Sequence, residues 1–381
     1  MVRPQAFGLT LSSHEKDQPA RNAGGFLLIN FTSIKSQKDM KKSRSKHRSV
    51  LCTNIFVFII LFIPGCISLE PLPDSIELEL EDAISRGLNG IIVYVDQNGG
   101  TAHFAAGWNN RENKVPADTQ SLFKIASISK LYIAAAAAKL VSSDSLSLDK
   151  TLAEYNPDLV GRIENAETIT LRMLLQHRSG IPDFIDHPDY PWGEPPMSTR
   201  KTLELVLDTP AEFLPDKRYK YSNTNYLLIG EILDRTLGYS HHQYIKKEIL
   251  QPLELNNTYS LLSEVNLDDV MSGYFIGYDL DIKQNDYIIP GGSMVATAQD
   301  VGIFLRALMD GTLFNDEEQA IYSSIYQYEH TGELPGYQSI ARYHADMDAV
   351  VIQFNNTSGG NSWSKSESVY RRIIRILEKE N

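Results

Sequence analysis

The sequence predicts an α+β protein in which helices flank an antiparallel sheet and a mainly helical subdomain stands beside it. Near the start, residues 90–95 and 101–107 are strand-like and lie on either side of a turn cluster rich in Asn and Gly. Near the end, residues 338–343 and 349–355 are strand-like too, and the long stretch between carries helical patterns. Hairpins at both ends indicate a sheet that the two chain ends complete together.

The helices are predicted from apolar periodicity and from the residues that end them. Residues 70–86 alternate acidic and apolar side chains, which is typical of an acidic amphipathic helix. An alanine-rich helix starts at Ser127, and Gly238 and Gly311 end two more. The remaining predicted helical segments are 171–176, 225–237, 298–309 and 367–379. We find no internal repeat or linker, so a single domain is expected over residues 70–381.

Residues 40–69 have the pattern of a targeting segment. A basic cluster at 41–48 precedes an apolar run at 55–63, which Pro64-Gly65-Cys66 breaks. Met40 stands directly before the basic cluster, so we expect residues 1–39 to be an upstream extension. Three fates of the leader stay open: a cleaved signal peptide, lipidation at Cys66, or an uncleaved membrane anchor over residues 50–69. In each case the body is exported, to a periplasmic or other extracytoplasmic location.

Charge and cysteine content exclude two classes of function. Residues 1–65 hold ten Lys or Arg and three Asp or Glu, while the whole chain of 381 residues has a net charge of −12. The body is therefore strongly acidic, which argues against a nucleic-acid partner. Both cysteines, Cys52 and Cys66, lie in the leader, so the body is expected to hold no disulfide and no thiolate metal site.

The most informative stretch is Ser127-Ile128-Ser129-Lys130 at the start of the alanine-rich helix. Residues three apart share a helix face, so the Lys130 amine can lie beside the Ser127 hydroxyl. A serine hydroxyl needs a base to become a nucleophile, and a lysine of lowered pKa can be that base. The same spacing occurs by chance elsewhere in the body, at Ser121/Lys124, Ser147/Lys150, Ser198/Lys201 and Ser362/Lys365.

Tyr221 and Asn223 form the second candidate element, in a loop that precedes an apolar helix. In an extended backbone, the side chains of residues two positions apart point to the same side. A phenol can relay a proton and an amide can bind a substrate carbonyl. The alternative is purely structural: a buried tyrosine and an asparagine that caps the helix.

His330-Thr331-Gly332, followed by Glu333, is the third element. A glycine in a strand lets a ligand approach the backbone closely. The threonine hydroxyl can bind a carboxylate or carbonyl, and the histidine can supply partial positive charge. The structural alternative is a turn at a strand edge with a surface histidine.

Other chemistries find little support in the sequence. His187 and the pair His241-His242 lack metal-ligand spacing, and no His-Glu-x-x-His motif occurs. There is no Gly-x-Ser-x-Gly elbow, and the glycine pairs do not form a phosphate loop. We therefore expect no metal and no cofactor.

Taken together, these segments resemble the serine β-lactamase and penicillin-binding-protein superfamily. The resemblance covers nearly all of residues 75–380 and is greatest to the branch of class C β-lactamases, D-alanyl-D-alanine carboxypeptidases and related esterases. It implies the β-lactamase/transpeptidase-like form of the α+β fold. Besides the three elements, residues 171–182 and 291–297 resemble recurrent segments of this branch.

The resemblance also implies roles for residues. Ser127 would attack a carbonyl and become acylated, with Lys130 and Tyr221 sharing the proton transfers. Asn223 would orient the substrate, and the N–H groups of Ser127 and Glu333 would form an oxyanion hole, in which one donor contributes about 3 kcal/mol. His330 and Thr331 would meet the carboxylate or acyl side of the substrate, beside Gly332. Water would then release the acyl group.

One departure from the family pattern narrows the expected activity. His330 stands where β-lactamases usually carry lysine, and an unperturbed histidine is mostly neutral at pH 7. This favours a carboxypeptidase-like or esterase-like serine hydrolase over a β-lactamase. The partner would be a small molecule or peptide: a D-amino-acid peptide, a β-lactam or an ester. The alternatives are a penicillin- or peptide-binding receptor without turnover and a purely structural membrane-anchored module.

Overall fold

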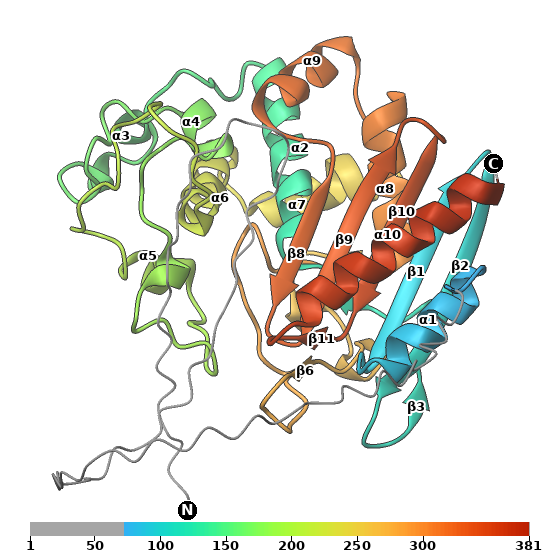
Figure 1. Cartoon of the computed structure of the whole chain (residues 1–381). Helices are drawn as coiled ribbons and strands as arrows, with labels where there is room; N and C mark the ends of the chain where they lie inside the picture. Colours follow the sequence, from blue (N-terminus) through green and yellow to red (C-terminus); the bar gives the residue numbers. More distant parts are fainter. Residues whose placement is uncertain (1–71, 381) are drawn as a thin grey trace, which may run out of the picture.

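The computed structural model describes residues 72–380 (Figure 1). The predictions for residues 1–39 and for the leader at 40–69 lie outside the described residues. Across the described part of the chain, no helix is both long enough and apolar enough to cross a bilayer.

The central feature is a six-stranded antiparallel sheet in the order β3-β2-β1-β10-β9-β8. Its strands are β1 (Gly90–Gln97), β2 (Gly100–Asn110), β3 (Val115–Pro116), β8 (His330–Leu334), β9 (Tyr337–His344) and β10 (Ala349–Asn355). The first hairpin joins the last one because β1 pairs with β10, with Val93 opposite Gln353. The predicted α+β fold, with a sheet completed by both chain ends, is confirmed.

Two smaller strand groups lie outside this sheet in the described residues. The short strands β4 (Phe123–Lys124), β7 (Val295–Ala296) and β5 (Thr258–Tyr259) pair in that order, and β11 (Thr357–Ser358) pairs with β6 (Tyr274–Phe275). β4 leads directly into the Ser127 segment, and β7 follows the Gly291-Gly292 segment. Their antiparallel pairing therefore brings these two segments together.

Helices cover both faces of the sheet and build the subdomain beside it. They are α1 (Ile76–Ser85), α2 (Ser129–Ser142), α3 (Leu152–Tyr155), α4 (Leu171–Leu175), α5 (Thr199–Leu203), α6 (Asn223–Leu237), α7 (His241–Ile245), α8 (Ala298–Asp310), α9 (Asp316–Ile325) and α10 (Ser362–Glu380). A π-helical turn, Lys246–Leu250, continues α7. α6 ends as predicted at Gly238, which has a left-handed conformation (φ 74°).

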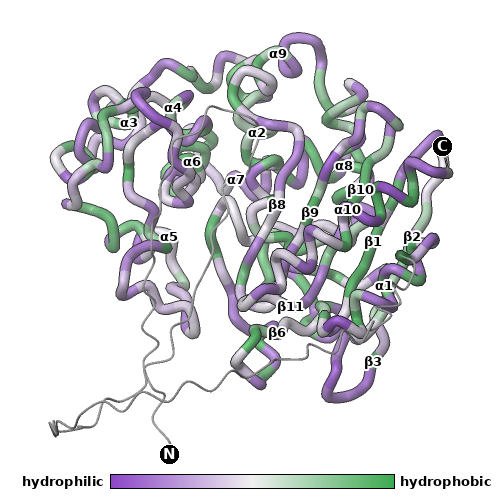
Figure 2. The backbone as a smooth tube through the Cα atoms, viewed as in Figure 1, coloured by the Kyte–Doolittle hydropathy of each residue, from purple (hydrophilic) through white to green (hydrophobic). Residues whose placement is uncertain are grey.

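Alternation along the central strands divides the core into two layers. Ile91 and Val93 pack with α1 and α10, whereas Ile92 and Tyr94 pack toward α2 and α8. Both sides of β1 and β10 are buried, and these strands are largely hydrophobic in Figure 2, unlike the exposed β3. The short helices α3, α4 and α5, together with α6, lie beyond β8, the outer strand of the sheet (Figure 1). The candidate site lies at this junction.

Candidate active site

The Ser127 side chain stands at the start of the most deeply buried helix. A 3₁₀ turn, Ala126–Ile128, leads into α2, and Ala126 before the serine has a left-handed backbone (φ 50°). Such a conformation is strained for a residue with a side chain, and strain of this kind often occurs at functional sites. Ser127 is half-buried, while its neighbours Ala126 and Ile128 are fully buried. The turn thus presents one hydroxyl from an otherwise closed interior.

Lys130 lies one helical turn later and has no exposed surface. Its Nζ lies 3.0 Å from Ser127 Oγ, 2.9 Å from Asn223 Oδ1 and 2.8 Å from the carbonyl oxygen of Gly291. A neutral amine has two hydrogens and one lone pair. The oxygens of Asn223 and Gly291 can accept the two hydrogens, which leaves the lone pair directed to the Ser127 hydroxyl.

Burial gives Lys130 the protonation behaviour of a base. It lowers the pKa of the amine to about 7, and the nearby Asp183 carboxylate opposes the shift. A large fraction of the amine is then neutral at physiological pH, as a general base requires.

Tyr221 lies beside the same amine and near the Ser127 hydroxyl. Lys130 Nζ is 5.1 Å from the centre of its ring, and its hydroxyl is buried. Burial raises the pKa of Tyr221, and the neighbouring Ser127 hydroxyl opposes this shift. Tyr221 is therefore a phenol at neutral pH and can donate a proton, which leaves Lys130 as the group suited to accept one.

His177 holds the Tyr221 ring in place. The two rings stack at 4.3 Å, and His177 Nδ1 accepts a hydrogen bond from the Ser222 N–H at 3.2 Å. Burial and the nearby Lys130 keep the pKa of His177 far below its usual range. A neutral, buried histidine in this position orients the tyrosine.

His330 is buried and neutral. Its Nδ1 contacts the carbonyl oxygen of Thr331, and its Nε2 lies 2.9 Å from the Tyr326 hydroxyl. Since Nδ1 must donate to a carbonyl, Nε2 accepts from Tyr326, and both ring nitrogens are engaged by the protein. Burial and Lys130 lower the pKa of His330 to about 3. The partial positive charge expected from the sequence is therefore lacking. The structural alternative, which placed His330 at the surface, does not hold either, because the side chain is buried.

The outer strand β8 carries the other predicted residues to the Ser127 turn. A Cβ on Gly332 would lie 2.4 Å from the Ile125 carbonyl oxygen, so only glycine allows this approach. The hairpin loop to β9 has two residues, which makes Leu334–Tyr337 the first bonded pair of the ladder. Bonded and non-bonded pairs then alternate, so the Glu333 N–H points out of the sheet edge, where an oxyanion donor is needed. The Glu333 side chain instead accepts from Gln338 Nε2 at 2.9 Å.

Thr331 is half-buried and pairs across the ladder with Ile340. Ile340 packs in the layer of α1 and α10. The Thr331 side chain therefore starts on the sheet face opposite to His330, and the hydroxyl can meet a ligand only around the sheet edge.

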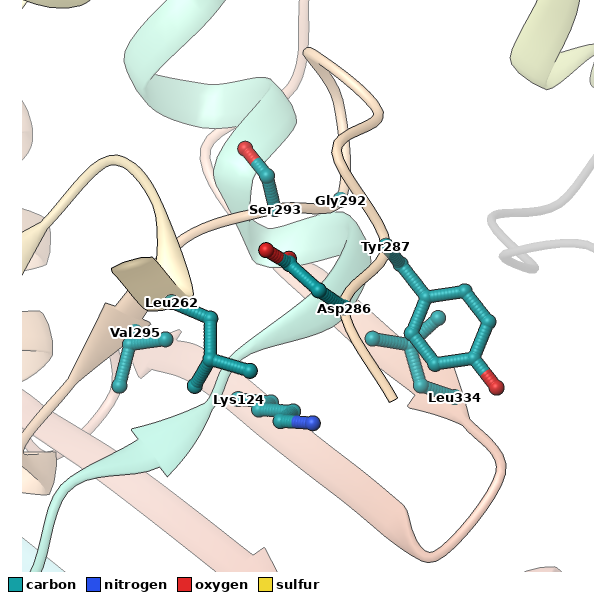
Figure 3. Close-up of a pocket in the computed structure, with 8 residues that line it drawn as sticks. All are labelled: Lys124, Leu262, Asp286, Tyr287, Gly292, Ser293, Val295 and Leu334. Carbon is teal, nitrogen blue, oxygen red and sulfur yellow. The ribbon is translucent and has the colours of Figure 1, made fainter. Parts of the chain in front are cut away.

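Lys124 is the lysine of the Ser121/Lys124 pair, one of the Ser-x-x-Lys matches expected to occur by chance. Its side chain is nevertheless buried. Its Nζ donates to the carbonyl oxygens of Lys283 at 2.6 Å and Asn285 at 2.7 Å. Figure 3 shows it among Leu262, Leu334, Asp286 and Tyr287, beside a cavity of about 10 Å³, which can hold a single water. Burial lowers the pKa of Lys124 to about 7 as well. No serine hydroxyl meets it, so its role is to hold the segment that leads to Gly291.

We expect Lys124→Met to destabilise the fold by about 1–3 kcal/mol, because two buried carbonyls lose their donor. Denaturant unfolding of the purified variant would measure this change. The folded fraction of the variant should keep most of its catalytic rate, since Ser127, Lys130 and Tyr221 stay in place. Unfolding curves that superimpose on those of the wild-type chain would contradict the role of Lys124.

Sequence reasoning missed three contributors to the site. Asp183 accepts from Asn223 Nδ2 at 2.9 Å, Gly291 supplies a carbonyl to Lys130, and Tyr326 engages His330. Gly291 lies in a segment whose resemblance to the family was recognised, and Asp183 directly follows another. The position of Tyr326 after α9 gives no signal in the sequence.

A family model described as Beta-lactamase matches residues 74–336, well over half of the chain. The chain belongs to the beta-lactamase family. Several penicillin-binding proteins are among the relatives of this family member. Penicillin-binding protein 4* of Bacillus subtilis is 25% identical over 205 residues, which cover 53% of this chain and 44% of that protein. The chain spans less than half the length of the first curated relatives it matches.

Solved structures share the fold of this chain. D-amino acid amidase from Ochrobactrum anthropi SV3 superposes with a TM-score of 0.71 at 22% identity, covering 80% of this chain and 98% of that one. The Beta-Lactamase/D-Alanine Carboxypeptidase from Pseudomonas syringae gives 0.65 at 16% identity, covering 79% and 97%. At these identities the likeness concerns the fold.

Proposed function

We propose that this chain is a serine hydrolase that works through an acyl-enzyme on Ser127. One observation carries the proposal: a fully buried lysine, with both hydrogens of its neutral amine accepted by protein oxygens, lies 3.0 Å from a half-buried serine hydroxyl. A lysine with only a structural role would not need its lone pair directed at a hydroxyl.

In the proposed reaction the Ser127 O–H passes its proton to Lys130 as Oγ attacks the substrate carbonyl carbon. The negative charge on the carbonyl oxygen is held by the N–H groups of Ser127 and Glu333. The Tyr221 phenol donates a proton to the leaving group, and Lys130 restores that proton. Water then attacks the acyl carbon of the Ser127 ester and passes a proton to Lys130. The bond between that carbon and Oγ breaks, Lys130 returns the proton to Oγ, and the acid is released.

The state of His330 favours substrates without a carboxylate. A carboxypeptidase or a β-lactamase must hold an anionic group of its substrate, yet His330 is neutral and its ring nitrogens are engaged. We therefore favour esters and amides, including those of D-amino acids, over peptides with a free terminal carboxylate. The amidase fold relative agrees with this choice, while carboxypeptidase activity stays the alternative within the same proposal.

Export is part of the proposal and rests on the sequence. The basic cluster at 41–48 and the apolar run at 55–63 support a periplasmic or other extracytoplasmic location. The leader also supports contact with a membrane.

The test measures adducts and turnover together. The purified chain and its Ser127→Ala variant are incubated with a chromogenic neutral ester, a D-Ala-D-Ala peptide and a fluorescent penicillin, and intact mass is followed over time. We expect ester turnover and a transient adduct that Ser127→Ala lacks. A permanent penicillin adduct without turnover would instead indicate a receptor. The proposal fails if neither adduct nor turnover depends on Ser127.

A further inference from the structure

A buried carboxylate, Asp183, is connected to Lys130 through the side-chain amide of Asn223. Asp183, in the loop between α4 and the 3₁₀ turn Phe184–Asp186, is only 6% exposed. Its Oδ2 accepts from Asn223 Nδ2 at 2.9 Å, and its Oδ1 accepts from the Ile185 N–H at 3.4 Å. Asn223 in turn directs Oδ1 to Lys130 Nζ at 2.9 Å. The three side chains form one continuous line into the site.

The Asp183 carboxylate and the Lys130 amine together determine the orientation of the Asn223 amide between them. A carboxylate only accepts hydrogen bonds and a lysine amine donates them, so the Asn223 amide has a single favourable orientation. Without the carboxylate, the amide could turn and present its NH₂ group to Lys130. Lys130 would then lose one of the two acceptors that direct its lone pair to Ser127.

The same carboxylate affects the charge of Lys130. A negative charge on Asp183 favours the ammonium form of the lysine. Burial raises the pKa of Asp183 to about 7, so this charge develops over the same pH range in which Lys130 titrates. The other titratable groups that face Lys130 come from several segments and have low or high pKa values that keep them neutral: His177, Tyr221, Tyr226 and His330. Asp183 itself faces Asp186 and Tyr190.

We propose that Asp183 is a positioning residue of the site. It orients the Asn223 amide toward Lys130, and its negative charge stabilises the ammonium form of Lys130. The inference rests on the proposed function, because it concerns the base of that reaction. Asp183 touches no reacting atom. Its effect reaches Ser127 through Asn223 and Lys130.

The test follows phosphonylation of Ser127 by a neutral alkyl fluorophosphonate against pH, with intact mass as the readout; Oγ bonds to phosphorus and fluoride leaves. This reaction needs the base but no turnover. Asp183→Asn keeps one oxygen to accept from Asn223 and removes the charge, while only the longer 3.4 Å bond from the Ile185 N–H is lost. The pKa of Lys130 should then fall, and the acidic limb of the profile should move to lower pH by about one unit. Below that limb the variant should react faster than the wild-type chain, which damage to the structure could not produce.

Two further variants separate orientation from charge. Asp183→Ala removes the acceptor as well, so the rate should fall about tenfold or more across the pH range. Asp186→Asn removes a neighbouring carboxylate that lies 3.8 Å from Lys220 Nζ, and it should leave the limb in place. The inference is overturned if Asp183→Asn and the wild-type chain have the same profile. A wild-type chain that does not react at Ser127 would instead overturn the proposed function.

Discussion

Replacing Lys130 with methionine should lower both ester turnover and the rate of Ser127 acylation by about 10⁴-fold, because no other group can take the serine proton. Tyr221 cannot substitute, since burial raises its pKa and keeps it a phenol. Methionine fills a similar volume, so the helix should stay packed. Steady-state kinetics with a neutral ester and single-turnover acylation would give the two losses.

The pH dependence of the wild-type chain adds a second readout to this experiment. In the proposed mechanism the ammonium form of Lys130 is inactive and the amine is active. Because burial lowers this pKa to about 7, kcat/KM should rise as the pH increases through about 7 and then level off. The residual activity of Lys130→Met should lack this rise.

The chain offers a matched control at Lys124. This lysine is also buried, has a pKa lowered to about 7 and stands three residues after a serine, but its amine contacts two backbone carbonyls. Lys124→Met should therefore change stability and retain most of the catalytic rate. Equal losses of activity in the two variants would mean that Lys130 acts by packing and not as a base.

The fold could be predicted from local patterns because its main elements are long or carry clear end signals. The β1–β2 and β9–β10 segments alternate, and Gly238 and Gly311 end α6 and α8. The boundaries were less accurate: α10 begins at Ser362 and not near 367, because polar residues fill its first turn. Short helices such as α5 have too few residues to show a period.

The site could be predicted where its contacts are local. Ser127 lies in the 3₁₀ turn that leads into α2, and Lys130 lies three residues later in the first turn of α2, so their spacing alone brings them together. Asn223 begins α6, and its side chain contacts Lys130 and Asp183 and does not cap the helix, as the structural alternative would require. Gly291 lies 161 positions from Lys130, and that contact depends on strand pairing that no local pattern encodes.

A neutral His330 is expected from the sequence, but its burial and its hydrogen-bond partners could not be predicted, for a related reason. A histidine in a sequence has its ordinary pKa near 6.5, and only its surroundings change that value. In the folded chain the Tyr326 hydroxyl and the Thr331 carbonyl contact the two ring nitrogens of His330, and burial lowers its pKa to about 3. The engagement of both ring nitrogens, on which the proposed preference for substrates without a carboxylate depends, therefore comes from tertiary contacts that the motif does not show.

Gly332→Ala should lower kcat/KM by about 10²-fold, because it separates the two halves of the proposed oxyanion hole. The new methyl group would lie 2.4 Å from both the Ile125 carbonyl oxygen and Ser339 Oγ, and 3.0 Å from Ala126 Cβ. Ser339 Oγ also donates to that carbonyl at 2.9 Å, so the strand and the turn are joined there. β8 must move away from the Ser127 turn, and the Glu333 N–H moves with it.

Ester kinetics and denaturant unfolding separate the two consequences of this change. Overpacking should cost about 1–3 kcal/mol of stability, so the protein should still fold and bind ester while reacting slowly. Gly100→Ala is the matched control: it lies on the hairpin end of β2, where a Cβ would meet its nearest atom at an ordinary 3.7 Å. Wild-type turnover in Gly332→Ala would show that the contact between β8 and the Ser127 turn does not set the geometry of the reaction.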